Sequence, residues 1–245
     1  MKKTQNFSIK LILYAVFTLI IFFSALNSLA APVKTDGPDF EAKPVTIDKA
    51  TTVLLSCHMQ NDIANPEGKL KVFGAQAGKA GTANHVAKAL KIARENGLMV
   101  WHLNTYHRPG YPEYGRPPLP AQCEWIKKEK AILDGTWGQQ FVPGCEPVGE
   151  EPIIRSPTVS GFAQGDMASL LQGWGVKTVV LMGVSTASVI TGTTIDLKDH
   201  GFRVIILGDC CSAKSWEEHN FMLKYILKQW AAITNLDSFS AALTK

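Results

Sequence analysis

The chain has 245 residues, of which 46% are hydrophobic, and its formal net charge is +4 at pH 7. Lys2, Lys3 and Lys10 are the charged residues of the first 30, so residues 31–245 carry a net charge of 4 − 3 = +1. A charge this small excludes the basic surface typical of proteins that bind nucleic acid or anionic membranes, and it favours a protein that acts on a small molecule.

The first 30 residues predict a secretory signal peptide. The three lysines precede an apolar run over residues 11–26, and Ser28 and Ala30 supply the small residues of a cleavage site. Cleavage after Ala30 would leave a secreted or periplasmic protein that is not attached to a membrane. An uncleaved anchor helix is the alternative, although the run is shorter than the roughly 20 residues that span a bilayer.

Residues 31–50 are polar and contain prolines, which predicts a flexible lead-in to a single domain over residues 51–245. Within that domain, segments typical of strands and helices alternate along the chain. The expected strands cover residues 51–57, 98–104, 152–155, 177–183, 202–208 and 231–236. The expected helices cover residues 82–97, 124–133, 165–175 and 185–201, and a turn and helix follow over residues 209–230.

This alternation predicts a three-layer α/β/α domain with a mostly parallel, six-stranded sheet. Such sheets bind ligands at the carboxyl ends of their strands. The residues that follow the expected strands are therefore the candidate site residues. The segment from Thr105 to Glu151 is long and rich in proline and glycine, and a connection of this length inside a compact domain is usually functional.

The five cysteines leave one alternative open. An exported protein enters an oxidising environment, so Cys123 and Cys145 either form a disulfide across the long segment or remain free. The adjacent Cys210 and Cys211 have poor geometry for pairing with each other. No spacing of cysteine and histidine resembles a zinc site, so we expect neither a metal nor another cofactor.

Three groups of segments together resemble the isochorismatase-like hydrolases of the cysteine hydrolase superfamily. They are "LLSCHMQNDI" at residues 54–63, "IIRSPTVSGF" at 153–162 followed by residues 170–189, and residues 193–213. The resemblance covers about residues 51–238. It implies a Rossmann-like fold that hydrolyses an amide C–N or vinyl ether bond of a small molecule. In that family an aspartate acts as base, a lysine steadies charge and a cysteine attacks the carbonyl carbon.

The chain departs from that family at all three positions. His58 stands at the aspartate position, Val189 at the cysteine position, and Ser156 or Arg155 at the lysine position. Because valine has no nucleophilic atom, a thioester cannot form at residue 189. The resemblance then implies hydrolysis with His58 as acid or base and Arg155 as the stabilising charge, with the turn after Gly183 holding an anionic oxygen.

The same hypothesis assigns ligand contacts to Asn61, Ser156, Gly183, Ser185, Thr186 and Val189. Helix capping is the alternative role for Ser185 and Thr186. Two further interpretations remain. The three substitutions are also expected of a catalytically inactive pseudoenzyme that binds a small ligand or a protein partner. The second of these interpretations is a protein that acts through its surface, as a homo-oligomer or with another partner, because the family commonly forms oligomers.

Overall fold

In this computed structural model the described residues are 32–163 and 166–244, and the signal peptide predicted for residues 1–30 lies outside them. The residues from Lys34 onward form one compact unit. No helix within the described ranges has both the length and the apolar character needed to cross a membrane.

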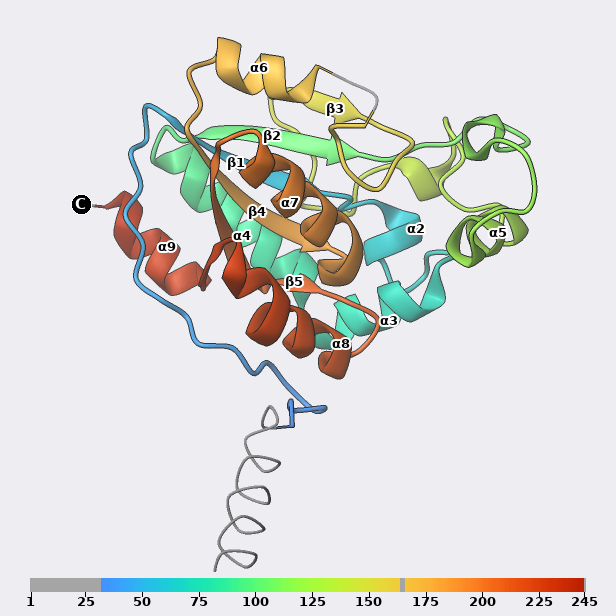
Figure 1. Cartoon of the computed structure of the whole chain (residues 1–245), viewed down its shortest axis with the longest axis horizontal. Coiled ribbons are helices and arrows are strands. Elements are labelled where there is room, and N and C mark those ends of the chain that lie inside the picture. The colour runs from blue at the N-terminus through green and yellow to red at the C-terminus, as the bar shows by residue number, and fades with distance from the viewer. Residues whose placement is uncertain (1–31, 164–165, 245) are drawn as a thin grey trace, which may run out of the picture. The chain divides into compact units, whose positions relative to one another are not determined.

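All strands of the sheet run parallel, in the order β3-β2-β1-β4-β5-β6 (Figure 1). The chain order therefore reverses at β1 and β4, and the sequence-based prediction of a six-stranded parallel sheet is confirmed. The strands are β1 (Thr52–Cys57), β2 (Met99–Asn104), β3 (Ile153–Arg155), β4 (Thr178–Val184), β5 (Arg203–Ser212) and β6 (Ala232–Thr234).

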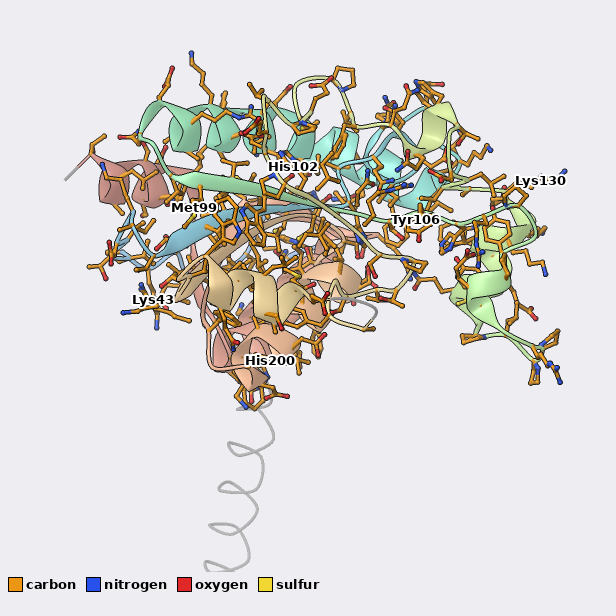
Figure 2. All side chains as sticks on the ribbon, turned by 90° about the horizontal axis from the view of Figure 1, so that it is seen from above. Lys43, Met99, His102, Tyr106, Lys130 and His200 are labelled. Carbon is orange, nitrogen blue, oxygen red and sulfur yellow. The ribbon has the colours of Figure 1, made fainter. Side chains whose placement is uncertain are left out.

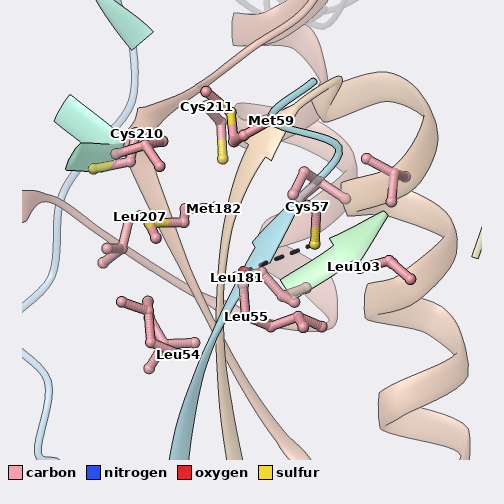
Figure 3. Close-up of a cluster of buried hydrophobic side chains, with 14 of the residues drawn as sticks. Leu54, Leu55, Cys57, Met59, Leu103, Leu181, Met182, Leu207, Cys210 and Cys211 are labelled. Atoms are coloured by element: carbon pink, nitrogen blue, oxygen red, sulfur yellow. Dashed lines mark hydrogen bonds between the residues drawn. The ribbon is translucent and has the colours of Figure 1, made fainter. Parts of the chain in front are cut away.

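The central strand β1 is buried along its whole length. It lies between β2 and β4, and Leu54 is in register with both Val100 and Val180. Helices cover both faces of such a sheet, so a continuous apolar run is the sequence pattern that this position requires. Figure 3 shows Leu54, Leu55 and Cys57 packed among side chains of the neighbouring strands.

Helices form the two outer layers, with α3, α4 and α9 on one face and α6, α7 and α8 on the other (Figures 1 and 2). The sequence did not predict α3, whose two glycines obscure its helical pattern, or α9. The helices are α2 (Asn61–Ala64), α3 (Lys71–Ala80), α4 (Thr82–Glu95), α5 (Ala121–Lys128), α6 (Met167–Gly173), α7 (Thr191–Asp199), α8 (Trp216–Phe221) and α9 (Leu236–Leu243).

Strand β5 is longer than predicted. The expected turn at Asp209 is wrong, because the strand continues to Ser212 and pairs again with β4 after a register shift. Cys210 and Cys211 are both buried, so they extend the apolar interior of the sheet rather than leave it. This extension places the end of β5 beside Gly183 and Val184, where β4 also ends.

From Lys34 onward, the segment predicted as a flexible lead-in makes contacts with the domain. The side-chain amide of Asn220 on α8 donates hydrogen bonds of 2.8 Å to the carbonyls of Lys34 and Gly37. The ring of Phe40 lies so close to Gly208 that a Cβ there would come within 2.6 Å of it. The lead-in thus covers α8 and β5 in the described structure.

Candidate active site

A cavity of about 500 Å³, here called the first cavity, lies at the carboxyl ends of β1 and β4. The long segment after β2 supplies a second wall, including Thr105, His107 and Tyr114. Parallel sheets bind ligands at this edge, where the strand order reverses. The structure thus puts a cavity where the sequence predicted one, and it makes the long segment part of the wall.

His58 lines this cavity immediately after β1. Its φ is 51°, an uncommon value for a residue other than glycine, and its backbone N–H donates to the Leu103 carbonyl at 2.8 Å. The residue is only 7% exposed, and its Nε2 accepts or donates no hydrogen bond among the described residues. Burial, with a smaller contribution from His107, lowers the pKa of His58 to about 3. The imidazole is therefore neutral at physiological pH.

The turn after β4 forms the floor of the cavity. Val184, Ser185 and Ser188 line it, the peptide bond between Val184 and Ser185 is cis, and the Ser188 hydroxyl donates to Ser185 Oγ at 3.2 Å. Gly183 lies below them with φ of 122°, and a Cβ on it would come within 2.1 Å of the Cys57 carbonyl. Only glycine allows β1 and β4 to approach this closely at the base of the site.

A cluster of polar groups from the long segment forms the opposite wall. Tyr114 Oη hydrogen-bonds His107 Nε2 at 2.8 Å, and His107 Nδ1 lies 3.9 Å from the Glu113 carboxylate. Burial lowers the pKa of His107 to about 4. Burial alone would raise the pKa of Glu113, but the side-chain hydrogen bond from Arg108, two backbone hydrogen bonds and the charge of Arg108 together outweigh it and lower the pKa. The wall therefore combines a neutral imidazole, a phenol and a carboxylate.

A family model described as the isochorismatase domain matches residues 52–238. The chain belongs to the isochorismatase family. The matched residues run from the first residue of β1 into α9, so they include every strand of the sheet and the cavity at the ends of β1 and β4.

Curated relatives of this isochorismatase-family protein include amidohydrolases. The maleamate amidohydrolase of Pseudomonas putida is 29% identical over 145 residues, which cover 58% of this chain and 65% of the relative, slightly less than two thirds of its length. The ureidoacrylate amidohydrolase RutB of Methylobacterium radiotolerans is 27% identical over 217 residues, covering 82% of this chain and 83% of the relative. The protein is therefore related to enzymes that hydrolyse amide C–N bonds.

Solved structures of the family share the fold. An isochorismatase-like hydrolase from Alkaliphilus metalliredigens superposes with a TM-score of 0.65 at 25% identity, covering 79% of this chain and 99% of that one. A cysteine hydrolase from Pseudomonas syringae pv. phaseolicola superposes with a TM-score of 0.72 at 19% identity, over 83% and 99% of the two chains. At that lower identity the likeness concerns the fold alone.

In the segment "HMQNDI", the residues after His58 attach the long segment to the sheet. The Gln60 side chain bonds both the carbonyl (2.7 Å) and the N–H (2.8 Å) of Thr105. Asn61 Nδ2 donates to the Trp137 carbonyl at 3.0 Å, and Asn61 does not line the cavity. Asn61 thus holds the wall in place, and its predicted ligand contact stays a prediction.

Asp62 continues this attachment. Its carboxylate accepts hydrogen bonds from the backbone N–H groups of Lys69 at 3.1 Å and Ile132 at 2.7 Å. A Cβ on Gly138 would lie 1.9 Å from Asp62 Oδ2, so glycine is needed where the long segment passes the carboxylate. His58 faces the cavity, whereas the three polar residues from Gln60 onward position the wall that closes it.

Thr186 and Val189 do not line the first cavity. Thr186 Oγ1 hydrogen-bonds His219 Nδ1 at 2.8 Å, and Val189 is fully buried in the core. Ser185 precedes the π-helix Thr186–Ile190 as its N-cap residue, but its side chain makes no capping hydrogen bond. Ser188, within this π-helix, lines the cavity, and the sequence analysis did not identify it.

Arg155 and Ser156 border a second cavity of about 400 Å³ between β3 and α6, and neither lines the first. Arg155 forms an ion pair with Asp134, and its guanidinium lies 4.3 Å from the centre of the Tyr106 ring. The structure therefore does not bring together His58 and Arg155, which the sequence analysis had combined in one site.

Cys123 and Cys145 are free thiols and do not form a disulfide. Cys123 lines the first cavity, whereas Cys145 Sγ donates a hydrogen bond to the Ala83 carbonyl at 3.6 Å. Burial raises the pKa of Cys123. Among the described residues no group of histidines, cysteines and carboxylates is arranged to hold a metal ion.

Proposed function

We propose that this protein hydrolyses the C–N bond of a small amide in the first cavity, with His58 as the base. The observation that carries this proposal is the neutral, buried imidazole of His58, which lines the cavity at the carboxyl end of β1. The amidohydrolase relatives support the choice of bond.

In the proposed step, the oxygen of a water molecule attacks the amide carbon while its proton passes to His58. The proton then moves from His58 to the leaving nitrogen as the C–N bond breaks, which yields a carboxylic acid and an amine. Positioned acid–base groups contribute about 10²–10⁴-fold to such reactions. The Ser185 hydroxyl lies in the same wall, accepts a hydrogen bond from Ser188, and can donate its own proton to the carbonyl oxygen.

A second candidate function is ligand binding without turnover. The pKa of about 3 favours it, because so weak a base takes a proton from water less readily than an imidazole with an ordinary pKa. Val189, buried in the core, offers no thiol at the position where the family has one. A neutral imidazole still donates and accepts hydrogen bonds, so this pseudoenzyme would keep His58 as a binding residue.

The experiment measures amine or ammonia release from a panel of small amides by the wild type, His58→Ala and Arg155→Ala. We expect turnover by the wild type, a loss of about 10²-fold or more in kcat/KM for His58→Ala, and less than about twofold for Arg155→Ala. Equal activity of wild type and His58→Ala contradicts the proposal. Saturable binding without turnover across the panel replaces it with the second candidate.

We also propose that the protein acts outside the cytoplasm, on the basis of the sequence of residues 1–30. Sequencing the amino terminus of the protein purified from its native cells tests this. A start at Ala31 supports export with cleavage, whereas retention of residues 1–30 in a membrane fraction supports the anchor helix.

A further inference from the structure

The walls of the first cavity carry an unusual combination of charges for a site in this protein. Among the described residues, no lysine or arginine lines the cavity, and Glu113 contributes a carboxylate. Its two histidines do not supply positive charge at neutral pH, because burial lowers the pKa of His58 to about 3 and that of His107 to about 4. The described wall is therefore neutral to negative.

The cations that contact residues of the wall are already paired. Arg108 Nε donates to Glu113 Oε1 at 2.5 Å, and the Arg108 side chain is 65% exposed. Lys214 Nζ lies 5.6 Å from the centre of the Phe73 ring and 3.9 Å from the Glu218 carboxylate. Neither cation faces the cavity without a carboxylate beside it.

The rest of the wall is largely apolar. Aliphatic and aromatic side chains come from three directions: Ile63 on α2, Phe73 on α3 and Ile126 on α5, each no more than 8% exposed. Such walls stabilise a bound apolar group by about 25 cal/mol for each Å² removed from water. A bound carboxylate would lose its hydration there without gaining a cation, which costs several kcal/mol.

We propose that the first cavity selects an uncharged amide with an apolar body, such as a small ring or branched chain, and discriminates against carboxylate-bearing molecules. This inference deepens the proposed function and uses the same cavity, but it concerns binding and does not require turnover. It also separates this cavity from one built for an anionic amide such as maleamate, the substrate in the name of one relative.

Gln122 and Ala121 provide a matched pair of variants on α5. Gln122 lines the cavity, whereas its neighbour Ala121 is exposed and does not. Gln122→Lys adds a cation to the wall, and Ala121→Lys adds the same charge to the same helix outside it. Both positions are exposed, so neither substitution disturbs the core.

The test compares 3-phenylpropanamide with 3-phenylpropanoate, which share an apolar body and differ in charge, by isothermal titration calorimetry at pH 7. We expect the wild type to bind the amide at least about tenfold more tightly, a difference of about 1.4 kcal/mol. Gln122→Lys should reduce this ratio at least about fivefold by strengthening anion binding, and Ala121→Lys should leave it unchanged.

Equal or tighter binding of the anion by the wild type overturns the inference, as does failure of both probes to bind. An equal effect of the two lysine variants overturns it too, because the charge would then act from outside the cavity. Tight binding of the amide without its hydrolysis supports the inference while counting against the proposed catalysis. The two proposals therefore fail on different results.

Discussion

The two cavities show how differently the protein treats the two groups that the sequence analysis had paired. In the first, His58 is buried, neutral and without a hydrogen bond from Nε2 to any described residue. In the second, Arg155 is about half exposed and already engaged by Asp134 and Tyr106. Position at the end of a strand was therefore not enough to define a site residue.

In this protein, whether a side chain already has a partner distinguishes a candidate catalytic residue such as His58 from a structural one such as Arg155. An exposed ion pair satisfies both of its charges and contributes little to stability. An unpartnered buried nitrogen, by contrast, costs about 1–3 kcal/mol unless a ligand or reaction uses it. Both cavities border such a nitrogen, His58 Nε2 at the first and Trp101 Nε1 at the second. Of these two groups only the imidazole can accept a proton, so the proposed chemistry is placed at the first cavity.

The largest expected effect compares one glycine from each region. Gly183→Ala places a Cβ 2.1 Å from the Cys57 carbonyl at a φ of 122°, and we expect a loss of more than about 4 kcal/mol in the free energy of unfolding. Gly161→Ala, in the wall of the second cavity, meets Met167 Sδ at 2.6 Å. Because that side chain can move, we expect a loss of only about 1–2 kcal/mol.

Urea unfolding of both variants measures these losses. If Gly183→Ala unfolds within about 1 kcal/mol of the wild type, β1 and β4 do not meet as closely at the floor of the first cavity as described.

An intermediate effect is expected from acid. The folded-state pKa of His58 is about 3, below its unfolded value of about 6.5, so the unfolded state binds the proton first. The stability contributed by neutral His58 is complete above pH 6.5 and is lost as the pH falls from there towards 3. Between pH 7 and pH 4, we expect the free energy of unfolding of His58→Asn to fall by on the order of 2 kcal/mol less than that of the wild type.

Urea unfolding at several values between pH 7 and pH 4 tests this expectation, with His200→Asn, at an exposed position, as the control. An unchanged pH dependence in His58→Asn would contradict the expectation, because it would show that the pKa of His58 is the same in the folded and unfolded states.

The smallest effect is expected at the second cavity. The side chains of Arg155 and Asp134 are 44% and 43% exposed, so solvent screens their attraction. We expect Arg155→Ala to lower the free energy of unfolding by less than about 1.5 kcal/mol, including the contact with Tyr106, and to leave ligand binding in the first cavity unchanged. A double-mutant cycle with Asp134→Ala measures the pair, and a coupling above about 2 kcal/mol would contradict this view.

Much of the fold could be predicted because its strands are short apolar runs separated by amphipathic helices. The run ending at Cys57 has to be buried on both faces, which a parallel sheet provides. The pattern failed where local composition was misleading. Gly74 and Gly78 obscured α3, and the polar Asp209 suggested a turn in a strand that continues to Ser212.

The site was predictable only in part, because spacing along a strand says nothing of what a side chain contacts. His58 was found from its position after β1, and the structure places it in the cavity wall. Asn61 and Thr186 follow strands too, yet each is taken up by a partner distant in sequence, Trp137 and His219. Ser188 was missed because a serine within a turn carries no signal in the sequence that it lines a cavity.

The central claim, that a neutral His58 in the first cavity meets the ligand, is tested most directly by nuclear magnetic resonance of its ring nitrogens. We expect a pKa below about 5 for the free protein and a clear shift of the His58 signals when 3-phenylpropanamide saturates the protein. A His58 that titrates near its ordinary value of about 6.5, or signals unchanged at saturation, would contradict the account.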